Sequence, residues 1–278
     1  MVVSGLRRIG IVRTRKRFGQ HFLEPVWADK VVDAIAPAHD DVFLEIGPGR
    51  GILTLRLAPR VSTLIAVEID RDLIASLAPQ LPANASIAPG DVLAIELRDV
   101  VASIDAATPI RIAGNLPYNI SSPIVFRLLE LAAQRAVKDA TLMLQREVAD
   151  RLAAKPGTAD YGVLSVLVQW RADVTRLLVL PPGAFRPPPA VRSAVIQLAF
   201  RPPRFPVIDE RVFEGMVRSM FTQRRKTLSN ALGPFAAGLG VAAPDVLGQA
   251  GVDPRRRPET LEIVEITRLA DIFAGAGR

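Results

Sequence analysis

The sequence alternates short apolar runs with amphipathic segments between residues 42 and 154, and this alternation constrains the fold more than any other feature. The apolar runs predict strands at 42–46, 64–67, 85–88, 110–113 and 140–144. Helical spacing follows at 52–58, 70–77, 121–131 and 147–154. Ser121 or Ser122 is expected to cap the third of these helices, with Pro123 in its first turn. Strands that alternate with helices indicate βαβ units, so we predict an α/β, Rossmann-like, mostly parallel sheet with helices on both faces.

The chain changes character after residue 154. A helix is expected at 163–170, followed by strands at 174–180 and 194–200. Proline is then dense from 202 to 206, which we interpret as a domain boundary. The last helices are expected at 212–221, 226–232 and 260–273, with no strand between them. The predicted domains are therefore residues 1–203, with the sheet, and a small all-helical domain over residues 204–278.

The composition excludes several classes of protein. With no Cys and only two His, a disulfide framework, a thiolate metal site and a His-rich metal site are excluded, and we expect no bound metal. No apolar run reaches membrane-spanning length, and no apolar segment of the signal-peptide kind follows the N-terminal arginines. These observations predict a soluble, cytoplasmic protein that does not bind membranes.

The net charge of +7 is unevenly distributed. It divides into +5 over residues 1–30, −4 over 31–170 and +6 over 171–278. This pattern suits a mildly acidic catalytic core between basic segments that bind a polyanion, although scattered solvated arginines would give the same totals.

A glycine-rich turn follows the first predicted strand. Gly47, Gly49 and Gly51 permit a tight turn and a close approach of the backbone to a ligand at a helix N-terminus. A dinucleotide fingerprint requires glycine at position 52, where this chain has Ile52, so a dehydrogenase is disfavoured. An ordinary glycine turn is the alternative interpretation.

Acidic residues follow the next two strands. Glu68 stands 21 residues after Gly47, where a carboxylate can bind two ribose hydroxyls. The alternative for such a residue is a helix cap, which Asp70 suits better than Glu68. Asp91, after the third strand, is placed to accept from the amine of an adenine. Three such features at successive strand ends indicate a ligand site at the carboxyl edge of the sheet.

The fourth strand ends in Asn115, Leu116, Pro117 and Tyr118. Such a run puts an amide oxygen and a free backbone carbonyl beside an aromatic face. These groups can accept two hydrogen bonds from an exocyclic amine while the ring stacks on the base. A proline turn with a half-buried tyrosine is the alternative.

These motifs, in this order, resemble the rRNA adenine N6-dimethyltransferase family, and most closely its bacterial small-subunit branch. The resemblance extends from the segment 15–23 through 45–51, 68–70, 90–91, 114–122, 144–148, 161–165 and 184–195 to 223–228. It implies S-adenosylmethionine as the cofactor and two adjacent adenines near the 3′ end of small-subunit rRNA, in the immature 30S subunit, as the substrate. Small-subunit biogenesis would be its setting.

The resemblance also implies roles for single residues. His21 and Leu23 would contact the cofactor from a covering loop, although the family often has Asn where this chain has His21. Gly47 and Gly49 would lie against the methionine portion, Glu68 would bind the ribose and Asp91 the adenine. Asn115 would touch both cofactor and target. Phe185 would stack on the target adenine opposite Tyr118, with a plain core position as the alternative.

RNA phosphates are assigned to two basic groups. They are Arg15, Lys16 and Arg17, joined by Arg13, and Arg224, Arg225 and Lys226, with 255–257 as weaker candidates. For each arginine taken singly, a solvated surface role is the favoured interpretation.

Two other functions remain open. A large-subunit rRNA methyltransferase conferring macrolide resistance would share the glycine turn, but usually has Ile-Pro-Phe where this chain has Leu116, Pro117 and Tyr118. A mainly non-catalytic ribosome-assembly factor would use only the basic surface. We expect a monomer.

Overall fold

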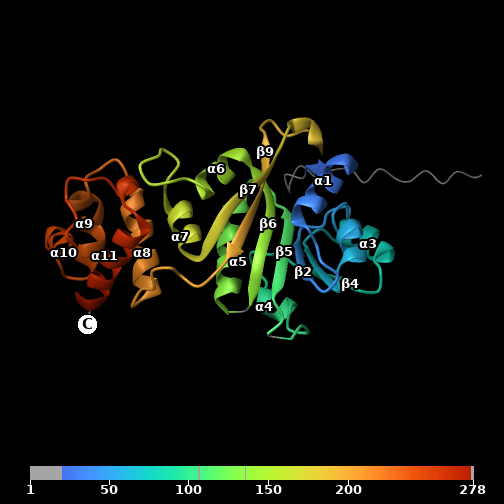
Figure 1. The fold of residues 1–278 in the computed structure, drawn as a ribbon, viewed down its shortest axis with the longest axis horizontal. Helices are drawn as coiled ribbons and strands as arrows, with labels where there is room; N and C mark the ends of the chain where they lie inside the picture. Colours follow the sequence, from blue (N-terminus) through green and yellow to red (C-terminus); the bar gives the residue numbers. More distant parts are fainter. Residues whose placement is uncertain (1–20, 106, 135, 277–278) are drawn as a thin grey trace, which may run out of the picture.

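The computed structural model describes residues 21–105, 107–134 and 136–276. Its centre is a seven-stranded sheet of order β4-β3-β2-β5-β6-β9-β7 (Figure 1). The strands are β2 (Val42–Ile46), β3 (Thr63–Glu68), β4 (Ala85–Pro89), β5 (Ile110–Asn115), β6 (Val137–Gln145), β7 (Ala172–Leu180) and β9 (Ser193–Phe200). Strands β2 to β6 pair in parallel, while β9 is antiparallel to both β6 and β7. The predicted α/β sheet is confirmed.

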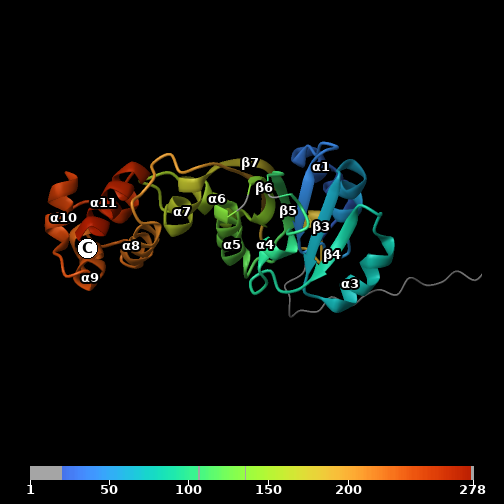
Figure 2. The ribbon, with the colours of Figure 1, turned by 90° about the horizontal axis from the view of Figure 1, so that it is seen from below.

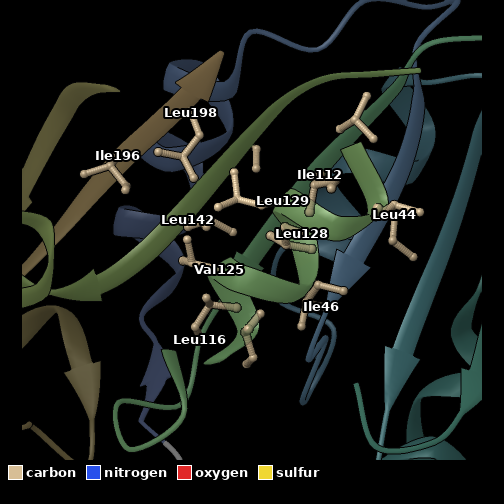
Figure 3. Close-up of a cluster of buried hydrophobic side chains, with 14 of the residues drawn as sticks. Leu44, Ile46, Ile112, Leu116, Val125, Leu128, Leu129, Leu142, Ile196 and Leu198 are labelled. Atoms are coloured by element: carbon tan, nitrogen blue, oxygen red, sulfur yellow. The ribbon is translucent and has the colours of Figure 1, made fainter. Parts of the chain in front are cut away.

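Helices cover both faces of the sheet because its central strands are apolar on both sides. One face packs against α1 (Pro25–Ile35) and α2 (Thr54–Leu57) around the buried Phe43. The other packs against α4 (Leu97–Val100), α5 (Ser121–Gln134), α6 (Arg146–Leu152) and α7 (Val163–Arg171). Figure 3 shows Val125, Leu128 and Leu129 of α5 lying on Leu44 and Ile112 of the sheet. This double cover leaves the strand ends as the accessible part of the sheet.

The C-terminal helices form a second hydrophobic core at one end of the molecule (Figure 2). They are α8 (Glu210–Thr222), α9 (Leu228–Gly238), α10 (Ala243–Ala250) and α11 (Ile263–Ala276), and no strand occurs between them in the described chain. The expected helical C-terminal region is thus confirmed. Its core also includes Trp170 of α7 and Tyr161, which precedes that helix.

Among the described helices, none is by itself long and apolar enough to cross a membrane. Only α9 and α10 taken together, bent by 113°, have sufficient length and apolar composition.

Several elements differ from the prediction. Helices α1, α4 (a single turn) and α10 were not predicted. Ser121 lies in the first turn of α5 instead of capping it, and this helix continues to Gln134. Helix α9 continues through Pro234 to Gly238, six residues beyond its expected end. Asp70, in contrast, caps α3 (Arg71–Leu77) by accepting from the backbone N–H groups of Asp72 and Leu73.

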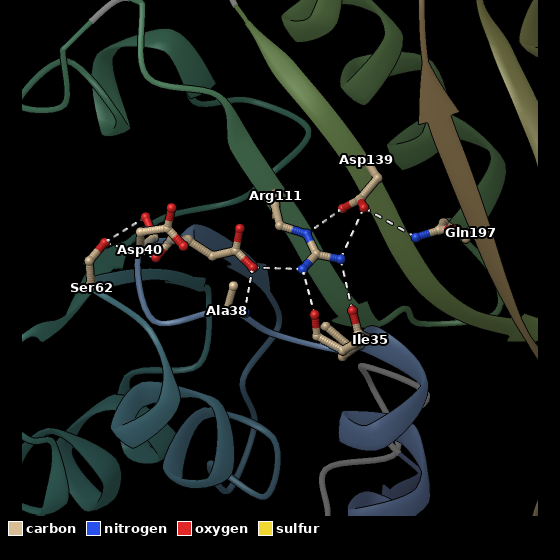
Figure 4. A network of polar contacts seen from close by, with 9 residues as sticks. Ile35, Ala38, Asp40, Ser62, Arg111, Asp139 and Gln197 are labelled. Atoms are coloured by element: carbon tan, nitrogen blue, oxygen red, sulfur yellow. Dashed lines mark hydrogen bonds and ion pairs between the residues drawn. The ribbon is translucent and has the colours of Figure 1, made fainter.

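Strand β5, whose end carries the Asn-Leu-Pro-Tyr run, is tied to its surroundings by the buried Arg111 (Figure 4). The guanidinium binds both oxygens of Asp139 on β6 at 3.0 Å and Oδ2 of Asp41 at 2.7 Å. It also donates to the carbonyl oxygens of Ile35 and Ala36 at the end of α1. All five N–H donors of the side chain are therefore used.

Candidate functional site

The order in which the parallel strands are added to the sheet reverses between β2 and β5. Strands β3 and β4 lie on one side of β2, and strands β5 and β6 lie on the other. Ligands of open α/β sheets bind at such a switch point, outside the carboxyl ends of the strands. A cavity of about 280 Å³ lies there. Its lining includes the ends of β2, β3 and β5, the segment after β4, and His21 to Leu23.

The glycine turn forms one wall of this cavity. Gly49 and Gly51 have φ angles of +58° and +80°, which side chains rarely tolerate. A Cβ on Gly51 would lie 2.3 Å from Leu77 Cδ1, so the turn also needs glycine for its packing against α3. A Cβ on Gly47 would meet nothing within 4 Å, so the turn is open at this cavity-lining residue, where the sequence predicted a ligand.

Glu68 joins the end of β3 to this turn. Its Oε1 accepts from the backbone N–H groups of Ile69 and Asp70, both at 2.9 Å. Its Oε2 accepts from the backbone N–H of Gly49 at 3.1 Å. A carboxylate offers about four acceptor positions, so one remains for a ligand hydroxyl.

Asp91 lies after β4 and lines the same cavity. Its Oδ1 accepts from the backbone N–H of Leu93 at 2.9 Å, which orients the side chain. Glu68 and Asp91, far apart in sequence, thus lie along one cavity with the glycine turn, as the order of the strands predicted.

Asn115 to Tyr118 form the opposite side of the cavity. The Asn115 amide Nδ2 donates to the carbonyl oxygen of His21 at 2.8 Å, which fixes the amide and leaves its Oδ1 as the acceptor. The Leu116 side chain is buried. The backbone N–H of Leu116 donates to the carbonyl oxygen of Met143 at 3.1 Å. Pro117 lines the cavity with them.

Tyr118 is held at both its face and its hydroxyl. The hydroxyl shares a 2.5 Å hydrogen bond with Ser193 Oγ of β9. Burial raises the pKa of Tyr118, and the Ser193 contact partly opposes that rise. The imidazole of His21 stacks on the phenol ring, with centroids 5.3 Å apart and planes inclined by 26°. Neither Ser193 nor this ring pair was predicted, since nothing in the local sequence indicates contacts across 75 and 97 residues.

His21 and Leu23 reach the cavity through strand β1 (Phe22–Leu23), which pairs antiparallel with β8 (Phe185–Arg186). The Nδ1 atom of His21 forms a hydrogen bond with the carbonyl oxygen of Pro187, at 2.8 Å. His21 therefore uses its backbone to hold Asn115 and its side chain to cover Tyr118.

Phe185 does not join the site. Its side chain is fully buried, pairs through β8 with Leu23, and belongs to the core beneath α1. The expected position opposite Tyr118 is therefore corrected: the alternative of a core residue describes the structure. The reason is the β1–β8 pairing, which turns this ring inward.

Sequence reasoning also missed Glu45. It lies at the fourth position of the buried strand β2, is 1% exposed, and lines the cavity. A charged residue inside an apolar run was the available signal, because carboxylates are rarely buried without a partner.

The basic residues have different surroundings. Arg15, Lys16 and Arg17 lie outside the described residues, as does Arg13. Arg224 is partly buried and donates to Ala159 O at 2.8 Å, with Glu259 at 3.9 Å. Arg225 and Lys226 are exposed.

The weaker phosphate-binding candidates, residues 255–257, also differ in their surroundings. Arg255 is paired with Asp253, and Arg256 with Glu265. Arg257 is exposed. In the described part of the chain, no group of three or more His, Asp or Glu side chains is arranged to hold a metal ion.

Comparison with known proteins finds one family that matches almost the whole chain. The family model described as ribosomal RNA adenine dimethylase matches residues 11–269. "Ribosomal RNA small subunit methyltransferase A" of Xanthomonas axonopodis pv. citri is 46% identical over 264 residues, covering 93% of this chain and 95% of that protein. The protein of the same name from Xanthomonas campestris pv. campestris has the same identity and coverage.

Solved structures show the same fold. A dimethyladenosine transferase from Plasmodium falciparum matches 92% of this chain and 98% of its own, with a TM-score of 0.74 and 24% identity. The 23S rRNA methyltransferase ErmE matches 91% of this chain and 99% of its own, with a TM-score of 0.63 and 25% identity.

Proposed function

Because the chain belongs to the ribosomal RNA adenine dimethylase family, we propose that its targets are two adjacent adenines in the 3′-terminal hairpin of small-subunit (16S) rRNA. The protein is an S-adenosylmethionine-dependent rRNA adenine dimethyltransferase. The relatives at 46% identity support the small subunit as substrate through their name. We further propose that it acts late in small-subunit assembly, as a cytoplasmic monomer that does not bind membranes.

The observation that carries this proposal is the convergence on one cavity of the glycine turn, Glu68, Asp91 and Asn115. The residues suit the cofactor: the turn leaves space for a ligand backbone, and two carboxylates offer acceptors for hydroxyl and amine groups. When bound, S-adenosylmethionine supplies an activated methyl group on a sulfonium. The chain therefore needs no nucleophile of its own.

The task of the protein is to orient the N6 amine of the adenine, whose lone pair is delocalised into the ring. In the first transfer Asn115 Oδ1 and the Leu116 carbonyl accept the two N6 hydrogens, so that the lone pair points along the direction of transfer. The N6 proton that the methyl group replaces passes to water. The hydrogen bond from Asn115 Nδ2 to His21 O holds the amide in this orientation. Positioning of this kind can supply roughly 7–11 kcal/mol. Stacking on Tyr118 adds about 1–3 kcal/mol toward extruding the base.

The domain division at residues 203 and 204 belongs to the same proposal. The sheet domain carries the chemistry, and Arg225 and Lys226 of the helical domain bind phosphate. Arg15, Lys16 and Arg17 serve as a second phosphate-binding group.

Asn115→Ala tests the mechanism. We expect kcat to fall by about 100-fold or more, as on removal of one preorganised polar group from an active site. Cofactor affinity should weaken by no more than about tenfold, the equivalent of the one hydrogen bond to His21. Transfer of labelled methyl groups and calorimetric cofactor binding measure the two effects. Gln80→Ala, on an exposed side chain that donates to the carbonyl oxygen of Ser76 in α3, away from the cavity lining, is the control. A variant with near wild-type turnover would contradict the mechanism.

The substrate is tested with the same label. Immature small subunits and free large-subunit rRNA are offered separately, and the modified nucleotides are located. Label in the 3′-terminal hairpin supports the proposal. Label in large-subunit rRNA supports the macrolide-resistance alternative, and binding of small subunits without label supports a mainly non-catalytic assembly factor.

A further inference from the structure

The imidazole of His21 covers one face of Tyr118, the ring on which the target adenine is proposed to stack. The centroids of this ring pair are 5.3 Å apart and the planes are inclined by 26°. Both residues line the cavity with Asn115, whose Nδ2 donates to the carbonyl oxygen of His21. An adenine that is bound to the Asn115 amide and stacked on Tyr118 therefore meets the imidazole.

The other aromatic rings near the cavity are engaged elsewhere. Phe185 is fully buried in the core beneath α1. Phe22 lines the cavity but packs on the glycine turn, where a Cβ on Gly49 would lie 3.3 Å from its Cε1. The guanidinium carbon of Arg50 lies 4.2 Å from the centroid of the Phe22 ring. Among the described residues of the cavity lining, the ring pair is thus what remains for the two faces of a base.

The two rings are held differently. The hydroxyl of Tyr118 is anchored to Ser193 Oγ at 2.5 Å. The imidazole is tethered through Nδ1, which donates to the carbonyl oxygen of Pro187 at 2.8 Å, since a carbonyl can only accept. Strand β1, which carries the chain away from His21, pairs with only two residues of β8. We therefore expect the imidazole, and not the phenol, to move when the ring pair opens.

The spacing of the ring pair is slightly too small for a base between the rings. Stacked aromatic layers lie about 3.5 Å apart, so a base between two rings needs their centroids roughly 7 Å apart. From 5.3 Å the pair has to open by roughly 2 Å. An inserted base covers again both ring faces that opening exposes. Stacking on two faces of the base outweighs the single ring contact that is lost.

We propose that His21 is the second base-stacking residue: the target adenine inserts between its imidazole and Tyr118, which close on each other in the free protein. Enzymes that act on an extruded base commonly hold it between such side chains. The inference rests on the proposed function and deepens it, because it moves the His21 side chain from the cofactor to the RNA base. The ring pair holds a flat base, and Asn115 with the Leu116 carbonyl selects the exocyclic amine.

A double-mutant cycle on kcat/KM tests the insertion. Initial rates of transfer of labelled methyl groups to immature small subunits, at saturating S-adenosylmethionine, are compared for the wild type, His21→Ala, Tyr118→Ala and the double variant. Each single variant should lose about 3- to 10-fold, because it loses one stacking face but no longer has to break the ring contact. The double variant avoids that cost only once, so its loss should exceed the product of the single losses by about 2- to 10-fold.

The cycle distinguishes insertion from two other roles of the imidazole. If His21 only supports Tyr118 from the far side, the ring contact persists in the complex, and the double variant loses no more than Tyr118→Ala. If the imidazole only blocks the ring until RNA arrives, His21→Ala raises kcat/KM.

Two further variants separate the ring of His21 from its tether. His21→Phe keeps an aromatic ring without the Pro187 hydrogen bond, and kcat/KM should stay within about threefold of the wild type. His21→Asn keeps a donor for Pro187 without the ring, and should lose about as much as His21→Ala. His39→Ala, on the other histidine of the chain, which is exposed, should match the wild type. Circular dichroism checks the fold of every variant.

Cofactor affinity gives a readout that separates the base from the cofactor. Calorimetric titration with S-adenosylmethionine should give affinities within about threefold of the wild type for all His21 variants. The reason is that the oxygen of His21 that holds Asn115 belongs to the backbone and remains in each of them.

The inference is overturned if the double variant loses no more than the product of the single losses, if His21→Ala raises kcat/KM, or if His21→Asn matches the wild type. It is also overturned if the His21 variants lose cofactor affinity in proportion to kcat/KM, which would assign the imidazole to the cofactor. In these cases methyl transfer by the wild type, and so the proposed function, still stands. Absence of transfer to small subunits by the wild type would overturn both.

Discussion

Replacement of Arg111 by methionine should destabilise the protein far more than loss of a surface ion pair. Methionine has a similar length but no donors. It would leave the carboxyl groups of Asp41 and Asp139, whose side chains are 10% and 7% exposed, without their shared cation. The carbonyl oxygens of Ile35 and Ala36 would also lose their donor.

The expected loss in free energy of unfolding follows from the buried charges that Arg111→Met leaves unpaired. Breaking a buried ion pair by removal of one partner costs about 3–5 kcal/mol, because the remaining charge stays buried. Protonation of the carboxyl groups or entry of water limits the loss, so we expect about 3–5 kcal/mol for Arg111→Met and not the sum over two pairs. Arg98→Met removes a pair whose side chains are 63% and 73% exposed. It should cost under about 1 kcal/mol.

Urea unfolding followed by far-ultraviolet circular dichroism measures both losses. A double variant with Asp139→Asn should recover part of the Arg111→Met loss, since it removes one uncompensated charge. A loss for Arg111→Met as small as that for Arg98→Met would refute the reasoning.

The loss should also depend on pH. Burial tends to raise the pKa of Asp41, but the hydrogen bonds from Ala38 and Arg111 lower it overall. A carboxyl with a lowered folded-state pKa stabilises the fold above its unfolded pKa, near 4, and loses this effect as pH falls through the folded value. The difference between wild type and Arg111→Met should therefore shrink toward pH 3.

Two further predictions concern residues to which the sequence analysis assigned contacts with RNA. Phe185→Leu should lower stability by about 1 kcal/mol or more, as expected for a shape change in a packed core, with little effect on affinity for RNA measured by filter binding. A large loss of RNA affinity with unchanged stability would restore the stacking role. Arg225→Ala with Lys226→Ala should weaken RNA binding and reduce the slope of log affinity against log salt by about 1–2, while Arg255→Ala, already paired with Asp253, should change neither. An unchanged slope for the double variant would exclude these two residues as phosphate ligands.

The sequence predicted the cavity well because parallel strands fix its position. Once 42–46, 64–67 and 110–113 are strands of one parallel sheet, Gly47, Glu68 and Asn115 must emerge at the same edge. No long-range information beyond the alternation is needed for this step. Helix α1 could also have been predicted from the sequence. It begins at Pro25, and its buried residues have helical spacing: Ala28, Val31, Val32 and Ile35.

Other features depended on contacts that a single sequence does not display. Phe185 turns inward because β8 pairs with β1, more than 160 residues away. Arg255 and Arg256 looked like free cations in the sequence, but Asp253 and Glu265 neutralise them locally. The burial of Glu45 beside the cavity was not visible either, because the sequence showed only that a carboxyl stood in an apolar run.

The second core includes α7, although this helix precedes the proline-rich segment 202–206 in the chain and so belongs in sequence to the sheet domain. Trp170 of α7 packs against Phe213 of α8 with ring centroids 4.5 Å apart, and its Nε1 donates to Phe205 O at 2.8 Å. Tyr161, just before α7, donates its hydroxyl to Leu261 O at 3.0 Å. A recombination event that joined the two ends of different relatives at residues 202–206 would therefore separate partners that pack together. Substitutions at the packed positions of α7 and α8 should accordingly co-vary among relatives, so that α7 evolves together with the C-terminal helices.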